Sequence, residues 1–244
     1  AVARFDEAAL LARSRGDSDS AALAVSYACF VLRGVIMHDR ARQQQICSAL
    51  ESLPEVDSSI RAMLLPVSVL GRTSASDLEQ RLVRTRAGVA MARRLRDART
   101  LAEALSCAHL ALWGAAPAQE LMAMANEHLE LARALHDDDE LLLDALIWQM
   151  VDSIELGHGL TLHKSSQEYA ARVQAHNGSW HRYMAALCET THHSCMGDLK
   201  RANELSWHAR SLGLRQQEPL AEAFFAVRQL FRWLHLSPSA AATE

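Results

Sequence analysis

Apolar residues recur along this chain with the period of an α-helix. Between Leu121 and Leu135, for example, they follow one another at spacings of three and four residues, with His128 as a polar interruption. These spacings place side chains on one face of a helix, whereas a surface strand would alternate apolar and polar residues. No stretch of the sequence alternates in that way. The pattern therefore predicts an all-α protein.

The apolar segments divide the chain into helices of similar length. We predict a first helix over 3–15, a last helix near 219–235 and, between them, helix pairs over 20–33 and 40–53, 58–70 and 77–95, 98–113 and 118–135, 139–156 and 160–175, and 179–195 and 199–212. Pro66 lies well inside the segment 58–70. Its ring and its missing N–H are expected to kink or break that helix.

Acidic or amide residues mark the start of every second helix. They recur at intervals of 40 residues, as Asp17, Asp57, Asp97, Asp137 and Asn177. Side chains of these types accept hydrogen bonds from the unpaired N–H groups of a first helical turn. We predict that each of them is the N-cap of the helix that follows.

Glycines form a second marker, out of phase with the first. They stand 37 to 43 residues apart, each at the end of an apolar segment, as Gly34, Gly71, Gly114, Gly157 and Gly197. Glycine readily adopts the left-handed conformation with which many helices end. The repeating unit is therefore a cap, a helix, a glycine and a second helix.

A helical hairpin cannot bury its apolar face alone, but stacked hairpins bury it between them. The repeat therefore predicts a right-handed α-solenoid of about six tetratricopeptide-like (TPR-like) hairpins with a concave inner groove. No linker rich in Gly, Ser or Pro divides the array. We expect residues 1–236 to form a single domain, followed by a flexible tail over 237–244.

Composition narrows the class of protein. The net charge of −4 argues against a general nucleic-acid surface, which needs an excess of Lys and Arg. Five scattered cysteines without a CxxC pair indicate reduced thiols, and no apolar run reaches the roughly 18 residues of a membrane span. We therefore expect a cytoplasmic protein without direct contact to nucleic acid or membrane.

Several segments resemble a known family. The stretches Ala92–Gly114, Ala118–Gly157 and Ser48–Leu65, and above all HLALWG at His109–Gly114, are similar to the TPR-like repeat region of bacterial STAND-type ATP-dependent transcriptional regulators, which include maltose-activator-like and LuxR-type proteins. The unit of about 40 residues exceeds the 34 of ordinary tetratricopeptide repeats, and their W-x2-L-G-x2-Y pattern is absent.

The resemblance implies a sensor arm that holds an effector or a partner protein and is flanked by ATPase and DNA-binding domains in a longer parent protein. This chain has no GxxxxGK[ST] phosphate loop and no evident DNA-binding helix pair. We therefore expect a non-enzymatic sensor or scaffold module without a cofactor. It would bind a small apolar ligand or a protein partner in its groove; a pure protein scaffold is the other open form of this hypothesis.

Aromatic residues are the candidates for the wall of that groove. Tryptophan at helical spacing is usually a core residue, but rings on a concave wall bind flat apolar ligands well. The candidate groove residues are His109, Trp113, Trp148, Trp180 and Tyr183.

A run of acids at Asp137–Asp144, HDDDELLLD with its preceding histidine, supports an alternative function. Carboxylates at Asp138, Asp139 and Asp144 could hold Mg²⁺ in a helical enzyme that acts on a prenyl-type substrate. However, the spacing misses the DDxxD pattern of such enzymes, and most of these acids fall where the repeat places its cap. We favour an N-cap with acids in the first helical turn.

Two further clusters have both a chemical and a structural interpretation. Cys188, His192 and Cys195 share one helical face, with His176 and His181 nearby, but four convincing zinc ligands are not evident. Seven arginines between Arg81 and Arg99 form a basic stretch, which is either a solvated helix face or a site for an acidic partner. We predict no metal and favour the solvated face.

Overall fold

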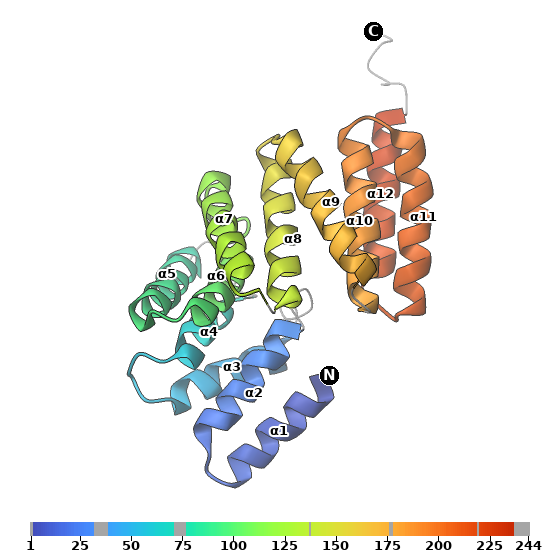
Figure 1. Cartoon of the computed structure of the whole chain (residues 1–244). Helices are drawn as coiled ribbons and strands as arrows, with labels where there is room; N and C mark the ends of the chain where they lie inside the picture. Colours follow the sequence, from blue (N-terminus) through green and yellow to red (C-terminus); the bar gives the residue numbers. More distant parts are fainter. Residues whose placement is uncertain are drawn as a thin grey trace. The chain divides into compact units, whose positions relative to one another are not determined.

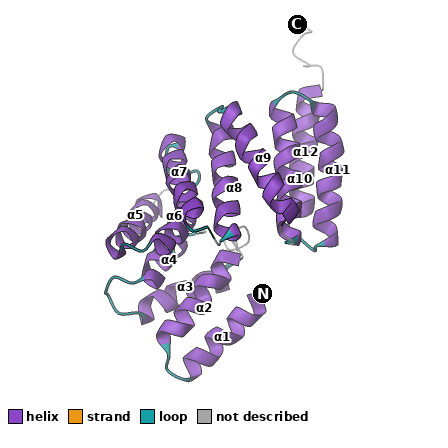
Figure 2. Ribbon diagram, in the orientation of Figure 1, coloured by secondary structure: helices purple, strands orange, loops and turns teal. Residues whose placement is uncertain are grey.

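The computed structural model describes residues 2–31, 39–70, 77–136, 138–175, 178–218 and 220–236. Within these residues the chain forms twelve α-helices and no strand, so the all-α prediction is confirmed (Figure 2). None of the helices in the described ranges is both long and apolar enough to cross a membrane.

The chain is built from two compact units, Ala1–Trp148 and Gln149–Glu244. Unit 1 contains α1 (Val2–Ser14), α2 (Ser18–Val31), α3 (Arg40–Ser52), α4 (Ser59–Val67), α5 (Leu78–Leu95), α6 (Ala98–Leu112), α7 (Ala118–Ala134) and the first part of α8 (Asp139–Glu155). Unit 2 contains the remainder of α8, α9 (Gly159–Ala175), α10 (Ser179–Cys195), α11 (Leu199–Arg215) and α12 (Ala221–Leu236) (Figure 1). That residues 1–236 form a single domain stays a prediction, and the tail 237–244 lies outside the described residues.

Helices that follow one another in the sequence pack against one another. In unit 1 this holds from α1 to α7, and α4 also contacts both α2 and α6. In unit 2, α9, α10, α11 and α12 pack in the same order. Contact between alternate helices is the arrangement that stacked hairpins produce. The predicted helix boundaries agree closely with those observed, and α4 shows the largest difference in unit 1.

Three of the five predicted caps fall on described residues. Asp17 accepts a hydrogen bond from the N–H of Ser20 at 3.0 Å and Asp97 from that of Thr100 at 2.8 Å, so both caps are confirmed. The prediction for Asp57 is wrong, because Ser58 is the N-cap of α4 and Asp57 instead accepts from Arg94. Asp137 and Asn177 lie outside the described residues.

The glycine marker is confirmed where it can be seen. Gly114, Gly157 and Gly197 have φ angles of 71°, 69° and 79°, in the left-handed region that terminates a helix. Gly34 and Gly71 lie outside the described residues.

The predicted kink or break at Pro66 is matched only by an early helix end, since Pro66 lies inside α4. The helix ends at Val67, one residue after the proline and short of the predicted residue 70. The adjoining core is made largely of small side chains, with Ala62 and Ala92 completely buried beside Ala104. Small residues of this kind let the backbones of neighbouring helices approach closely.

Candidate functional site

Helix α6 carries a line of polar and aromatic residues in unit 1. Arg99, Glu103, Ser106, His109 and Trp113 follow at spacings of three and four residues, so they share one helical face. Glu103, Ser106 and His109 are buried, whereas Arg99 and Trp113 are exposed. Buried polar groups need partners; Ser106 has one in Asp144 of α8, and Glu103 lies near Arg99 of its own helix.

The charged end of this line joins α6 to the start of α8. Nη1 of Arg99 lies 2.6 Å from Oδ2 of Asp138 and 3.8 Å from Oε1 of Glu103. Burial raises the pKa of the Glu103 carboxyl group; Arg99 opposes this rise and Asp138 adds to it. The guanidinium of Arg99 is therefore shared between a capping acid and a buried acid.

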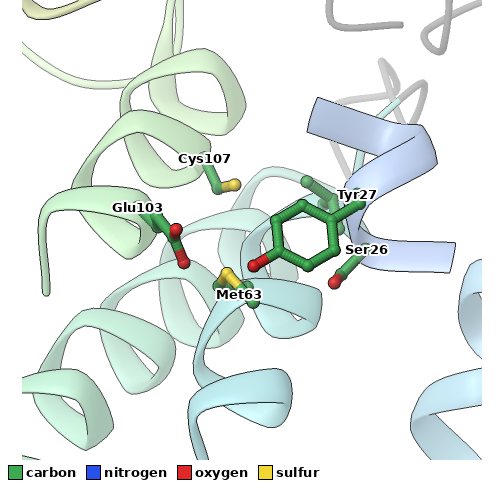
Figure 3. A pocket seen from close by; sticks show the side chains of 6 residues that line it. Ser26, Tyr27, Met63, Glu103 and Cys107 are labelled. Carbon is green, nitrogen blue, oxygen red and sulfur yellow. The ribbon is translucent and has the colours of Figure 1, made fainter. Parts of the chain in front are cut away.

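A small cavity adjoins Glu103 between α2, α4 and α6. It is lined by Ser26, Tyr27, Met63, Val67, Glu103 and Cys107 and has a volume of about 10 Å³. Figure 3 shows the phenol of Tyr27 pointing toward Glu103 across Met63. Such a volume holds about one water molecule, so the cavity is suited to hydrating the carboxyl group and is too small for an organic ligand.

The middle of the line is a buried hydrogen bond. The hydroxyl of Ser106 donates to Oδ2 of Asp144, and both residues are buried. Asp144 thus points into the contact between α6 and α8. Its role in this contact is to satisfy polar groups inside the unit.

Aromatic rings occupy the other end. His109 stacks on Trp148 with ring centroids 4.2 Å apart, and Trp113 packs edge-on against Trp148 at 6.2 Å. His109 and Trp148 are buried, while Trp113 is 44 % exposed. Three of the five predicted groove residues therefore lie together, and Trp113 presents ring surface to solvent.

The other two predicted groove residues belong to unit 2. Trp180 is partly exposed and packs edge-on against His181 at a centroid distance of 4.9 Å. Tyr183 is buried in a core cluster with Ala186, Leu187, Ala209 and Ala221. The ring of Tyr183 thus serves packing within α10–α12 in this structure.

The acid run serves α8. Asp138 accepts a hydrogen bond from the N–H of Leu141 at 3.1 Å, Asp139 is the first residue of the helix, and Asp144 faces Ser106. Asp137 lies outside the described residues. The capping interpretation is confirmed for Asp138, one residue after the position that the 40-residue interval predicts.

The candidate metal ligands on α10, Cys188 and His192, lie in surroundings that do not favour metal binding. Burial raises the pKa of the Cys188 thiol to about 12, which opposes the thiolate form that binds metals. Burial also lowers the pKa of His192, and His163 and His193 add to this effect; their ring centroids lie 5.3 Å and 5.6 Å from that of His192. His176 lies outside the described residues. The described residues contain no group of three or more His, Cys, Asp or Glu placed to hold a metal ion.

Four of the seven arginines in the basic stretch pair with acids, whereas Arg81 donates to the carbonyls of Ala111 and Trp113 and Arg84 donates to the hydroxyl of Ser68. Arg86 bonds to Glu120, Arg93 to Glu127, Arg94 to Asp57 and Arg99 to Asp138. All four arginines are exposed. At least half of each side chain is accessible to solvent. The predicted solvated face is thus formed by Arg86, Arg93, Arg94 and Arg99, while Arg81 and Arg84 are partly buried.

One candidate surface was missed by the sequence interpretation: the outward face of α12. The residues Leu220, Phe224, Val227, Leu230, Phe231 and Leu234, here called the α12 stripe, are between 36 % and 65 % exposed. The adjoining face packs on α10 and α11 with polar groups, since Arg228 donates to the carbonyl of Leu187 and Gln229 to Asn203. A helical projection of 220–236 would have located the stripe, but it could not have shown that the stripe faces outward.

No protein-family model matches this chain, and a search of curated proteins finds no match. The resemblance to STAND-type regulators therefore stays a prediction.

Proposed function

We propose that this chain is a non-enzymatic interaction module, a TPR-like α-solenoid of the kind found in the sensor region of bacterial STAND-type transcriptional regulators. The order of helix packing and the contacts of α4 with α2 and α6 support the stacked-hairpin form. The left-handed glycines that end α6, α8 and α10 support a repeated unit. On this proposal the module is cytoplasmic and works beside ATPase and DNA-binding domains of a longer protein.

The α12 stripe is the observation that carries the interaction function. It has no charged residue, and it is wide enough to be the core-facing side of a packed helix. Contiguous apolar surface of this kind marks protein interaction sites. The occupant we propose is the same stripe on a second copy of the chain.

Three properties favour a second copy. Leu220, Phe224, Val227, Phe231 and Leu234 follow at spacings of four, three, four and three residues, which is the seam of a helix pair. An uncharged stripe meets its own copy without repulsion, as a two-fold symmetric interface requires. Its exposed apolar area, on the order of 600 Å² for side chains of this size, approaches the roughly 800 Å² that each partner of a stable interface buries.

Sedimentation velocity of the whole chain over a concentration series tests this proposal. We expect a species of twice the 27.0 kDa chain mass. Val227→Glu should weaken the dimer at least about 100-fold, because two carboxylates would be buried in an apolar seam. The matched control is Leu160→Glu, since Leu160 is 81 % exposed on α9, outside the stripe. A monomeric wild-type chain, or equal effects of both variants, would contradict the proposal.

A second candidate function is the capture of a small, flat, apolar ligand in unit 1. The observation in its favour is the exposed ring of Trp113 against the stacked pair of His109 and Trp148. A planar ligand would stack on Trp113 at low entropic cost, because the neighbouring rings already hold it in place.

Thermal unfolding with indole and 1-naphthol as probes tests this second candidate. A compound that binds only the native state raises the unfolding midpoint saturably. We expect such a rise in the wild type and in Trp207→Ala, which removes another exposed tryptophan, and at least tenfold weaker binding in Trp113→Ala. Absence of any saturable shift, or equal losses in the two variants, would count against this site.

A further inference from the structure

A narrow crevice lies within unit 2, among residues of α10, α11 and α12. Figure 1 shows these three helices packed together. The polar residues that line it include Thr190, Ser194, Asn203, Ser206, Arg228 and Arg232. The enclosed volume is about 10 Å³, which is room for a single atom of the size of a water oxygen.

Some of these polar groups already form hydrogen bonds within the protein, and others have no hydrogen-bond partner. The hydroxyls of Thr190 and Ser194 donate to backbone carbonyls, at 2.7 Å and 2.8 Å. Nη2 of Arg228 donates to the carbonyl of Leu187 and to Oγ1 of Thr191. In contrast, Nε of Arg228, Nε of Arg232 and Oγ of Ser206 are buried without a hydrogen-bond partner. The crevice therefore offers unused donors from two helices.

The charge of the crevice is uncompensated. None of the residues that line it is Asp or Glu, and no carboxylate in the described part of the chain pairs with Arg228 or Arg232. Burial lowers the pKa of Arg228, because it disfavours the charged guanidinium. Arginine nevertheless stays protonated in proteins, and two like charges one helical turn apart repel each other. A bound anion would remove both costs.

We propose that this crevice binds an oxyanion of the phosphate or carboxylate type, with one anionic oxygen between the guanidinium groups of Arg228 and Arg232 and the hydroxyl of Ser206. The limited volume admits one oxygen, and the rest of the anion stays at the solvent-exposed mouth. Guanidinium groups suit oxyanions because their N–H donors match the geometry of such oxygens. A water molecule would accept hydrogen bonds without compensating the two charges. The crevice adjoins the α12 stripe, because Phe231 belongs to both, so the two proposals are tested by different readouts: anion binding here and sedimentation for self-association.

Isothermal titration calorimetry of the whole chain at constant ionic strength tests the proposal, with inorganic phosphate, acetate and chloride as separate probes. We expect saturable binding of phosphate or of acetate, and the stronger of the two identifies the class of anion. Arg232→Gln should raise the dissociation constant at least tenfold. Arg215→Gln is the matched control, because Arg215 is an exposed arginine of α11 whose bond goes to Ser211.

The variant Ser206→Ala distinguishes a loss of anion binding from a loss of stability, because the two are measured separately. It removes a buried hydroxyl without a partner, so the thermal midpoint in anion-free buffer should stay the same or rise, while the affinity for the anion falls. The proposal is overturned if neither oxyanion binds saturably, if chloride binds equally well, or if the Arg232 and Arg215 variants bind alike.

Discussion

Replacing Gly88 by alanine is expected to destabilise unit 1 by about 2 kcal/mol, within the range for overpacked helix contacts. A Cβ atom at this position of α5 would lie 2.7 Å from the carbonyl oxygen of Ala62 and 2.8 Å from Cδ of Pro66. Neither atom can turn aside, because one belongs to the backbone of α4 and the other to a closed ring. The overlap should exceed the gain of about 1 kcal/mol in helix propensity that alanine brings. Thermal unfolding followed by circular dichroism should show a midpoint roughly 5 °C lower.

Gly159→Ala is the matched control. Gly159 opens α9, has no heavy atom within 4 Å of the position that an alanine methyl group would take, and is not among the residues of positive φ. The same substitution should therefore leave the midpoint unchanged or raise it slightly. If both alanine variants unfold at the same temperature, α4 and α5 do not approach each other as closely as described, and the packing of that hairpin is wrong.

Gly88 also shows where sequence interpretation stops. The glycines that end helices could be recognised, since Gly114, Gly157 and Gly197 stand at regular intervals and adopt left-handed angles. Gly88 stands in the middle of a helix, outside that interval. Its importance comes from a neighbouring backbone, and apolar periodicity contains no information on how closely two helices approach.

The existence and order of the helices could be predicted because each carries its own apolar periodicity and every second one follows a capping residue. The cap at Asp97 is local, so it was found; the cap at Asp57 was wrong because Ser58, the next residue, can perform the same role. Which face of a helix packs inward is a tertiary property. The outward apolar stripe of α12, for which Val227 is representative, could therefore not be assigned from the sequence.

The five predicted groove residues stay a prediction as a site, although the structure brings three of them together. His109 and Trp113 lie on one helix with Trp148 on a helix that follows, and the repeat brings them together. Tyr183 has the same residue chemistry but lies in a core cluster. Residue type alone does not distinguish an exposed ring such as Trp113 from a buried ring such as Tyr183.

The ion pair of Asp6 with Arg42 is expected to give the largest pH-dependent contribution to stability. It joins α1 to α3 through two hydrogen bonds, one from Nη1 to Oδ1 and one from Nη2 to Oδ2 at 2.9 Å. Only 9 % of the Arg42 side chain is exposed, against 37 % of Asp6. Asp6→Asn would leave a buried guanidinium without its counter-ion. We expect a loss of about 1–2 kcal/mol, less than for a fully buried pair because solvent screens the carboxylate.

The sign of the pH dependence follows from the hydrogen bond to Arg42, which lowers the pKa of Asp6 below its ordinary value. A folded-state pKa below the unfolded one means that the stabilisation is present above the ordinary pKa and is lost as the pH falls through the folded-state value. Urea unfolding of wild type and Asp6→Asn should thus differ most near neutral pH and converge in acid. Burial raises the pKa of Glu103, so its carboxylate opposes folding at neutral pH. Glu103→Gln should therefore be more stable than the wild type near neutral pH, and this difference should shrink in acid. A constant difference between wild type and Asp6→Asn from neutral pH into acid would show that the pair contributes through packing and that its charge is unimportant.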